Sequence, residues 1–380
     1  MDRRTHLQPA EGVRRLPLTQ LSFYMTNGCN LTCQYCWPGS KQTAEETSEY
    51  FLTVDRIGAA IREALPLGLQ TVRLTGGDPL SHPDIDRLLD RLESLELMVE
   101  IETPGWGLTP LRAARLAHMR QSSVLIGIDG ADASTHDGIH QTPGAFDAAV
   151  QAIKLLSTAG LAPQIVTSVM RSNISQLPAI IHLVESLGAA SLRIVLMNNR
   201  LGHPQIAGSN RHHPPKDKQE GLAVEELIAL GRRVERDLSQ TTRLQLLFDQ
   251  PPVFRGLHST SRMIGPGRCN ILNSLSVLPG GEYGLCGGSE LIPALTFGRV
   301  GEMPLAQIWN DNPTLQTLRQ GMPDRLGGVC GHCVMKTACL GNCVVENYLS
   351  TDTLWGPYWF CDAAARSGLF PAGRIIENVW

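Results

Sequence analysis

Short apolar runs alternate with amphipathic segments through the first half of the chain. Residues 71–75 (TVRLT) form one such run and stop at a glycine pair, while residues 54–65 carry apolar side chains at helical spacing. The first pattern predicts a strand and the second predicts a helix with one buried face. The strands expected in this way are residues 21–26, 71–75, 97–102, 123–129, 163–170 and 191–197, and the helices between them are residues 54–65, 83–95, 111–119, 145–160 and 177–188.

Six strands that alternate with helices predict an α/β fold built from parallel βαβ units. A closed TIM barrel needs eight strands, so we expect a partial (β/α)6 TIM barrel, with a doubly wound sheet as the alternative. Both arrangements place functional residues at the C-terminal ends of the strands. Candidate chemistry should therefore follow the strands directly in sequence.

The pattern changes after residue 201. Residues 202–221 are polar and rich in Gly, Pro and His. We interpret them as a solvated loop, because the adjacent His212 and His213 have no other metal ligand nearby in sequence. A helix over 222–238 and a strand over 243–248 are expected next, and little regular structure is expected after Cys269. The expected parts are an N-terminal segment (1–18), a barrel (19–201), a linker with a bridging helix and strand (202–268), a small loop-rich C-terminal domain (269–365) and a tail (366–380).

Composition and charge exclude several classes of protein. The 380 residues are 42% hydrophobic and 18% charged, which permits a sizeable core and excludes global disorder. A net charge of −3 argues against nucleic-acid binding through bulk charge. No run of about 18 apolar residues is present, and the charged N-terminus lacks the apolar region of a signal peptide. We therefore expect a cytoplasmic protein with no nucleic-acid or membrane partner.

The ten cysteines fall into two groups, and the first lies directly after the first predicted strand. Cys29, Cys33 and Cys36 lie within eight residues, whereas the other seven follow residue 268. Clustered cysteines in a cytoplasmic chain predict metal ligands rather than disulfides. Three thiolates on one loop can bind three irons of a cubane cluster and leave the fourth iron open to a small molecule. A structural zinc site normally takes four protein ligands.

The Cys29-x3-Cys33-x2-Cys36 spacing, with Tyr35 before the last cysteine, resembles the signature of radical S-adenosylmethionine (radical SAM) enzymes. Residues 75–79 (TGGDP) resemble that family's Gly-Gly-Glu-Pro stretch, with Asp in place of Glu. The resemblance implies a [4Fe–4S] cluster that binds SAM and yields a 5′-deoxyadenosyl radical, which abstracts a hydrogen atom from substrate. It leaves any general base unknown.

The same resemblance implies which side chains contact SAM. For Ser168 and Ile194 the alternative is ordinary strand packing. His136-Asp137-x2-His140 resembles a His-Asp-x2-Arg motif on the loop after the fourth strand. Its two interpretations are a contact with substrate or SAM, and a hydrogen-bond cluster at a helix entry. The implied cofactor-binding residues are Tyr35, Gly76, Gly77, Asp78, Pro79, Asp129 (within residues 127–130, GIDG), Ser168 and Ile194.

The seven C-terminal cysteines resemble those of the SPASM extension, which carries two auxiliary [4Fe–4S] clusters. With the first group they imply three clusters and leave no cysteine over. The alternative is a zinc ribbon of Cys330, Cys333, Cys339 and Cys343. By resemblance, the first auxiliary cluster takes Cys269, Cys286 and Cys343, and the second takes Cys330, Cys333, Cys339 and Cys361.

Two departures from relatives affect the expected chemistry. The first auxiliary cluster lacks a fourth cysteine, which leaves an iron open to substrate, water or a non-cysteine ligand. Gly287 stands where anaerobic sulfatase maturases carry an Asp that serves as base, which argues against formylglycine formation.

The resemblance implies an oxidoreductase that modifies a ribosomally made precursor peptide by cross-linking, thioether formation or epimerisation. Because only about 20 residues precede the first strand, no fused peptide-recognition domain is expected at the N-terminus. The leader is expected to bind either a separate leader-binding protein or the enzyme's own surface. An electron donor such as flavodoxin or ferredoxin is also expected. The alternatives are modification of a small molecule or tetrapyrrole, and a zinc-stabilised or electron-carrying protein without catalysis.

Overall fold

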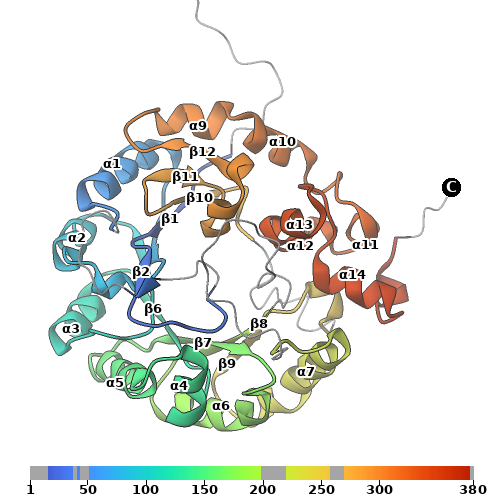
Figure 1. Ribbon diagram of the computed structural model, residues 1–380, viewed down its shortest axis with the longest axis horizontal. Coiled ribbons are helices and arrows are strands. Elements are labelled where there is room, and N and C mark those ends of the chain that lie inside the picture. Colours follow the sequence, from blue (N-terminus) through green and yellow to red (C-terminus); the bar gives the residue numbers. More distant parts are fainter. Residues whose placement is uncertain (1–15, 37–40, 43–50, 198–219, 257–268, 377–380) are drawn as a thin grey trace, which may run out of the picture.

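The computed structural model describes residues 16–36, 41–42, 51–197, 220–256 and 269–376. Most of its strands form one ten-stranded sheet in the order β12-β11-β10-β1-β4-β5-β6-β7-β8-β9. Helices form an outer ring around these strands (Figure 1). The predicted loop residues His212 and His213 lie outside the described residues.

Six parallel strands form the centre of this sheet, each paired with the next along the chain. They confirm the predicted partial barrel, with strand ends shifted by a few residues. Because the sheet ends at β12 and β9, it is not closed. The six strands are β1 (Gln20–Tyr24), β4 (Thr71–Thr75), β5 (Met98–Thr103), β6 (Ser122–Gly127), β7 (Gln164–Val169) and β8 (Ser191–Leu196).

Four further strands extend the sheet at both edges. β9 (Gln245–Phe248) pairs with β8 in parallel, and β10 (Ser274–Val277) pairs with β1 in parallel. β11 (Glu282–Gly284) and β12 (Thr296–Arg299) follow in antiparallel order. The expectation of little regular structure after Cys269 is therefore wrong. A separate small sheet joins β2 (Gly28–Cys29) to β3 (Lys41–Gln42).

The barrel helices pack their apolar faces against the sheet and begin at polar caps. Thr53 and Thr109 each accept a hydrogen bond at their hydroxyl oxygen from the third backbone N–H of the helix that follows. The buried aliphatic side chains of these helices belong to the main core of the molecule. The helices are α1 (Val54–Ala64), α2 (Ile85–Glu93), α3 (Pro110–His118), α4 (Ala133–His140), α5 (Ala145–Thr158), α6 (Leu177–Ser186) and α7 (Val224–Arg236).

The helix α4 lies where the sequence predicted only a loop. Its amino end is capped by Asp132, whose carboxylate accepts a hydrogen bond of 2.9 Å from the Thr135 backbone N–H. His136 and His140 are both buried, at 1% and 4% exposure. A mostly polar segment thus forms a helix because its cap and its tertiary contacts stabilise it.

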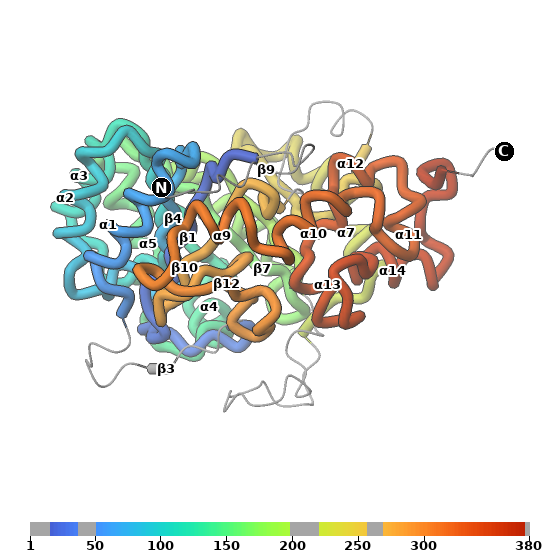
Figure 2. Tube along the Cα trace, turned by 90° about the horizontal axis from the view of Figure 1, so that it is seen from above, coloured from blue at the N-terminus to red at the C-terminus, as the bar shows by residue number. Residues whose placement is uncertain are grey.

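Short helices carry three of the seven C-terminal cysteines, Cys330, Cys339 and Cys361. Helices α11 to α14 lie at one end of the molecule (Figure 2). α14 packs against α7 and α11. The rings of Phe360 and Phe370 lie 5.0 and 5.7 Å from Phe254, which joins this end to the segment after β9. These helices are α9 (Leu305–Asp311), α10 (Pro313–Gly321), α11 (Gly328–Gly331), α12 (Lys336–Cys339), α13 (Val344–Thr351) and α14 (Trp359–Arg366).

Short 3-10 helices make several of the connections between these elements. They are η2 (Leu65–Leu67), η3 (Pro79–Ser81), η4 (Ile174–Gln176), η5 (Leu238–Gln240), η6 (Pro252–Phe254), η7 (Gly287–Leu291), η8 (Pro293–Leu295) and η9 (Ala372–Arg374). Across the part of the chain that the structure describes, no helix is both long and apolar enough to cross a bilayer.

Candidate metal centres

The first cysteine group lies on a loop that leaves the C-terminal end of β1 and is fixed against α4. Thr32 and Gln34 donate backbone hydrogen bonds to the carbonyl oxygens of His140 and Ile139, at 3.3 and 3.0 Å. Leu31 and Cys29 pack together in a small apolar cluster away from the main core. The loop, called the cysteine loop (residues 29–36) below, is therefore held against α4 by backbone hydrogen bonds.

Burial and mutual repulsion disfavour thiolates on this loop. Burial raises the pKa of the Cys29 thiol to about 12, and the nearby charges of Asp78 and Cys36 act in the same direction. The pKa of Cys33 is raised by burial and then by Cys36 and Cys29. Three sulfur groups within electrostatic reach of one another in an apolar setting fit a cationic group that offsets their charge.

A glycine pair brings the end of β4 against the cysteine loop. Gly76 and Gly77 have φ values of +75° and +59°, where glycine is favoured. A Cβ on Gly77 would overlap the carbonyl oxygen of Gly28, and one on Gly76 would come within 2.6 Å of the Tyr24 ring. This close approach explains why two glycines stand directly after the strand.

The buried carboxylate of Asp78 stabilises the same junction between β4 and the cysteine loop through hydrogen bonds. Its carboxylate accepts hydrogen bonds from the Thr103 hydroxyl (2.7 Å), the Leu80 backbone N–H (3.1 Å) and the Asn30 amide (3.2 Å). Asp78 is fully buried, which raises its pKa to about 6. Pro79 follows as the first residue of η3. Asp78 thus has a structural role, while contact of Asp78 or Pro79 with SAM stays a prediction.

Asp129 lies after the end of β6, and its carboxylate contacts polar groups from three segments. Its carboxylate accepts hydrogen bonds from the Tyr35 hydroxyl (2.5 Å) and the Ser168 backbone N–H (2.7 Å). His140 Nε2 lies 3.0 Å from the same carboxylate. Although burial opposes ionisation, His140 and these donors hold the pKa of Asp129 below its usual range. Asp129 is therefore an ionised, multiply bonded centre beside the cysteine loop.

His140 also contacts a cysteine, which sequence reasoning did not identify. Its Nδ1 lies 2.9 Å from the Cys33 sulfur. His136 accepts the Asp129 backbone N–H at 3.1 Å, and Asp137 accepts two backbone N–H groups at the start of α5, each at 2.8 Å. The Asp of this motif therefore serves a helix entry, while its two histidines face Asp129.

Two other predicted SAM contacts have clear packing roles. Ile194 is fully buried in the core of the sheet. Ser168 bonds through its backbone, donating to Asp129 and accepting from the Asn173 amide at 2.9 Å. Contact of either residue with SAM stays a prediction.

The inner face of the partial barrel is polar. Val72 and Leu74 of β4 are fully buried in the core, so the alternate residues Arg73 and Thr75 point to the other face. There the Glu102 carboxylate accepts hydrogen bonds from Arg73 (2.6 Å) and Thr75 (3.0 Å). A polar inner face fits a binding chamber better than a packed barrel core.

Three C-terminal cysteines from separate segments meet near the end of β1. Burial raises the pKa of Cys269 to about 12, and it also raises the pKa of Cys286 and Cys343. The charges of Glu346, Cys286 and Cys269 also raise the pKa of Cys343. The three sulfurs therefore lie at one site together with a carboxylate. These are the three cysteines expected for the first auxiliary cluster. Their role as ligands stays a prediction.

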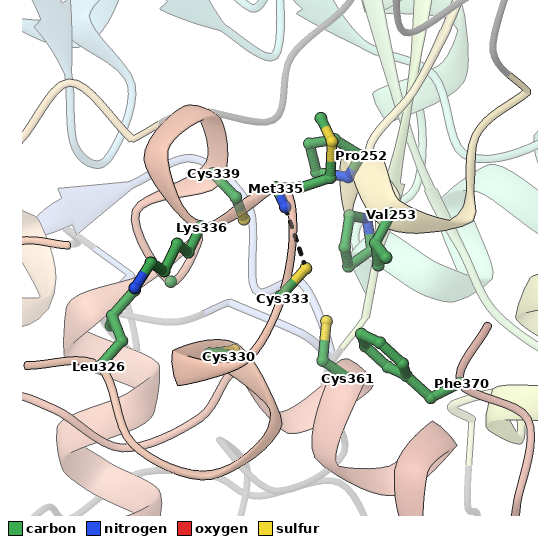
Figure 3. A pocket seen from close by; sticks show the side chains of 12 residues that line it. Pro252, Val253, Leu326, Cys330, Cys333, Met335, Lys336, Cys339, Cys361 and Phe370 are labelled. Carbon is green, nitrogen blue, oxygen red and sulfur yellow. Dashed lines mark hydrogen bonds between the residues drawn. The ribbon is translucent and has the colours of Figure 1, made fainter. Parts of the chain in front are cut away.

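Four other cysteines line one small cavity, and Figure 3 shows their side chains. Backbone N–H groups of Tyr358 and Met335 donate to the sulfurs of Cys330 (3.4 Å) and Cys333 (3.3 Å). Such N–H···S bonds are typical of iron–sulfur sites. The cavity is lined by Cys361 rather than by the Cys343 of the zinc-ribbon alternative. Its cysteines are Cys330, Cys333, Cys339 and Cys361.

No three His, Cys, Asp or Glu side chains within the described ranges converge as the ligands of a single metal ion do. In a cubane, by contrast, each cysteine binds a different iron.

The comparisons with known proteins agree with these sites. Residues 23–183 match the Radical SAM superfamily, and residues 269–334 match SPASM, an iron–sulfur cluster-binding domain. The chain is 27% identical to the AdoMet-dependent heme synthase of Methanosarcina barkeri, over 87% of this chain and 92% of that protein. It is 28% identical to the mycofactocin maturase MftC of Mycobacterium tuberculosis, over 89% and 81%.

The fold also matches a solved structure. Streptococcus suis SuiB bound to its precursor peptide SuiA superposes with a TM-score of 0.70 at 16% identity, covering 92% of this chain and 76% of SuiB. The Radical SAM match covers the cysteine loop and the glycine pair. The SPASM match begins at Cys269, the first of the seven C-terminal cysteines. This chain is therefore a radical SAM enzyme with a C-terminal SPASM iron–sulfur domain.

Proposed function

We propose that this enzyme modifies a ribosomally made precursor peptide by hydrogen-atom abstraction. The observation that carries the proposal is similarity along almost the whole chain to a mycofactocin maturase, at 28% identity over 89% of the residues. A PqqA peptide cyclase of Rhizobium meliloti is 24% identical over the same share. The sheet is not closed and its inner face is polar, which supports entry of an extended peptide from the open side.

The three cysteines of the cysteine loop fit the SAM-binding cluster. When bound, that cluster and SAM supply the 5′-deoxyadenosyl radical. Leu31 and Ala145 form an apolar cluster with Cys29, and the partly buried Trp106 packs against this cluster. Tyr35, Asp129 and Ser168 form a fixed polar wall beside it. We propose that Gly76, Gly77 and Pro79 present the backbone that contacts SAM.

The C-terminal cysteines fit two further clusters, which gives three in all. Four cysteines already surround one cavity, and three gather at the other site. We propose that flavodoxin or ferredoxin supplies electrons, that a separate protein presents the leader segment, and that the enzyme acts in the cytoplasm.

The experiment is anaerobic co-expression of the enzyme with the small peptide encoded beside its gene, followed by mass spectrometry. A loss of two hydrogens indicates a cross-link or thioether, and an unchanged mass with altered chirality indicates epimerisation. An unmodified peptide in the presence of SAM-cleaving enzyme would contradict the proposal. The matched control is a variant with Cys29, Cys33 and Cys36 replaced by Ala, which we expect to leave the peptide unchanged.

Modification of a tetrapyrrole is a second candidate, favoured by the 27% identity to AdoMet-dependent heme synthase. Incubating the reduced enzyme with SAM and tetrapyrrole precursors of heme separates the two candidates, since only one substrate class should be consumed. Formylglycine formation is disfavoured by packing. A Cβ at Gly287 would overlap the Tyr24 hydroxyl, so the acidic side chain of sulfatase maturases has no room there.

A further inference from the structure

His140 lies between a buried carboxylate and a cysteine of the SAM-binding loop. Its Nδ1 is 2.9 Å from the Cys33 sulfur, and its Nε2 is 3.0 Å from Asp129 Oδ2. His140 is 4% exposed and Asp129 is 1% exposed. Water therefore does not separate the three groups.

The imidazole is fixed from several sides. The His136 ring lies 4.1 Å from it, and the Tyr35 ring meets it edge-on at 5.9 Å. Its backbone carbonyl accepts the Thr32 N–H of the cysteine loop. Asp129 is itself held by Tyr35 and Ser168. The position of the ring relative to the Cys33 sulfur is therefore set by the fold.

A cysteine sulfur bound to iron carries no proton, so only an N–H group of His140 can make this contact in the loaded enzyme. A hydrogen bond to a ligand sulfur stabilises the additional negative charge of a reduced cluster. We propose that His140 donates this hydrogen bond to Cys33 and raises the reduction potential of the SAM-binding cluster. The inference rests on the proposed assignment of Cys33 as a cluster ligand.

The experiment is a redox titration of the anaerobically reconstituted holoenzyme with dithionite, which supplies one electron to the cluster, followed by electron paramagnetic resonance. The SAM-binding cluster is identified as the signal that changes when SAM is added. In His140→Leu we expect about a tenfold smaller ratio of reduced to oxidised cluster at a fixed potential, which equals a fall of about 59 mV for one electron. His140→Asn should recover most of this shift, because its amide nitrogen takes the place of Nδ1.

The matched control is His82→Leu, which removes another buried histidine whose ring nitrogens bond Leu52 and Asp84 and contact neither His140 nor the cysteine loop. Its midpoint potential should equal that of the wild type. The proposal is overturned if His140→Leu has the wild-type potential at unchanged iron content, or if His82→Leu shifts it equally.

A second measurement, on the wild type, tests the hydrogen bond if the His140→Leu protein does not bind its clusters. In wild type, exchange into D2O should shift the iron–sulfur stretching bands in resonance Raman spectra, and bands that do not move would contradict the hydrogen bond. The ligand assignment is tested separately. A Cys33→Ala protein that keeps both its full iron content and the SAM-sensitive signal would show that Cys33 is not a cluster ligand. It would not test the effect of His140 on the reduction potential.

Discussion

Replacing Gly77 by Ala combines two costs at the junction between β4 and the cysteine loop. The backbone there has φ +59°, where a residue with a Cβ loses about 1–2 kcal/mol relative to glycine. The new methyl would also overlap the Gly28 carbonyl oxygen, and forcing extra atoms into a packed site costs about 1–3 kcal/mol. The free energy of unfolding should therefore fall by about 2–5 kcal/mol in total.

Gly368→Ala provides the matched control. Gly368 has φ +69°, and no atom lies within 4 Å of its Cβ position, so the control carries the backbone strain alone. Urea unfolding should show a loss of about 1–2 kcal/mol for the control. Because Gly28 directly precedes Cys29, Gly77→Ala should also lose about four irons per chain by the stoichiometry of one cluster. Equal destabilisation of the two variants, with both retaining full iron, would refute the overlap argument.

Three further outcomes follow from the packing and the buried groups. Replacing Cys330 and Cys361 together by Ala should remove about four irons per chain and increase cleavage of the C-terminal segment in limited proteolysis. Equal proteolysis of mutant and wild type would contradict this. Trp309→Ala should lower the free energy of unfolding by about 3–5 kcal/mol in urea titrations, because the side chain is 1% exposed and donates to the Leu16 carbonyl oxygen at 2.7 Å. Burial lowers the pKa of His136 to about 4. Since the unfolded state binds the proton first, stability should fall as pH drops from about 6.5 towards 4, by up to about 3 kcal/mol, and His136→Gln should lack this dependence.

The central strands were predictable because their apolar runs are contiguous and end at glycine or polar turns, as residues 71–75 do at Gly76. β10, β11 and β12 were not, since each spans only three or four residues and β10 pairs with a strand far away in sequence. α4 was missed because its sequence, ASTHDGIH, has no apolar stripe. Its buried face is made of histidines whose partners come from other segments.

At the candidate sites, the spacing of the cysteines predicted which of them group together. It did not predict which other side chains lie beside them. Both cysteine groups could be recognised from the sequence because cluster ligands repeat at short intervals. The contact of His140 with Cys33 joins residues over 100 positions apart and depends on how α4 meets the cysteine loop. The sequence also did not indicate that the Asp129 carboxylate accepts hydrogen bonds from Tyr35 and Ser168. Its contact with SAM stays a prediction.

The pairing of β10 with β1 has a consequence for the order in which the protein is made. Gln20 on β1 is matched with Ser274 on β10, so one side of the first strand stays unpaired until the ribosome has added 254 more residues. At about 5–20 residues per second this interval lasts roughly 13–50 s. The cysteine loop leaves the end of that same strand. Its three thiols are therefore synthesised well before the sheet can be completed. During that interval they are open to oxidation and to binding of other metal ions, until the last third of the chain has been made.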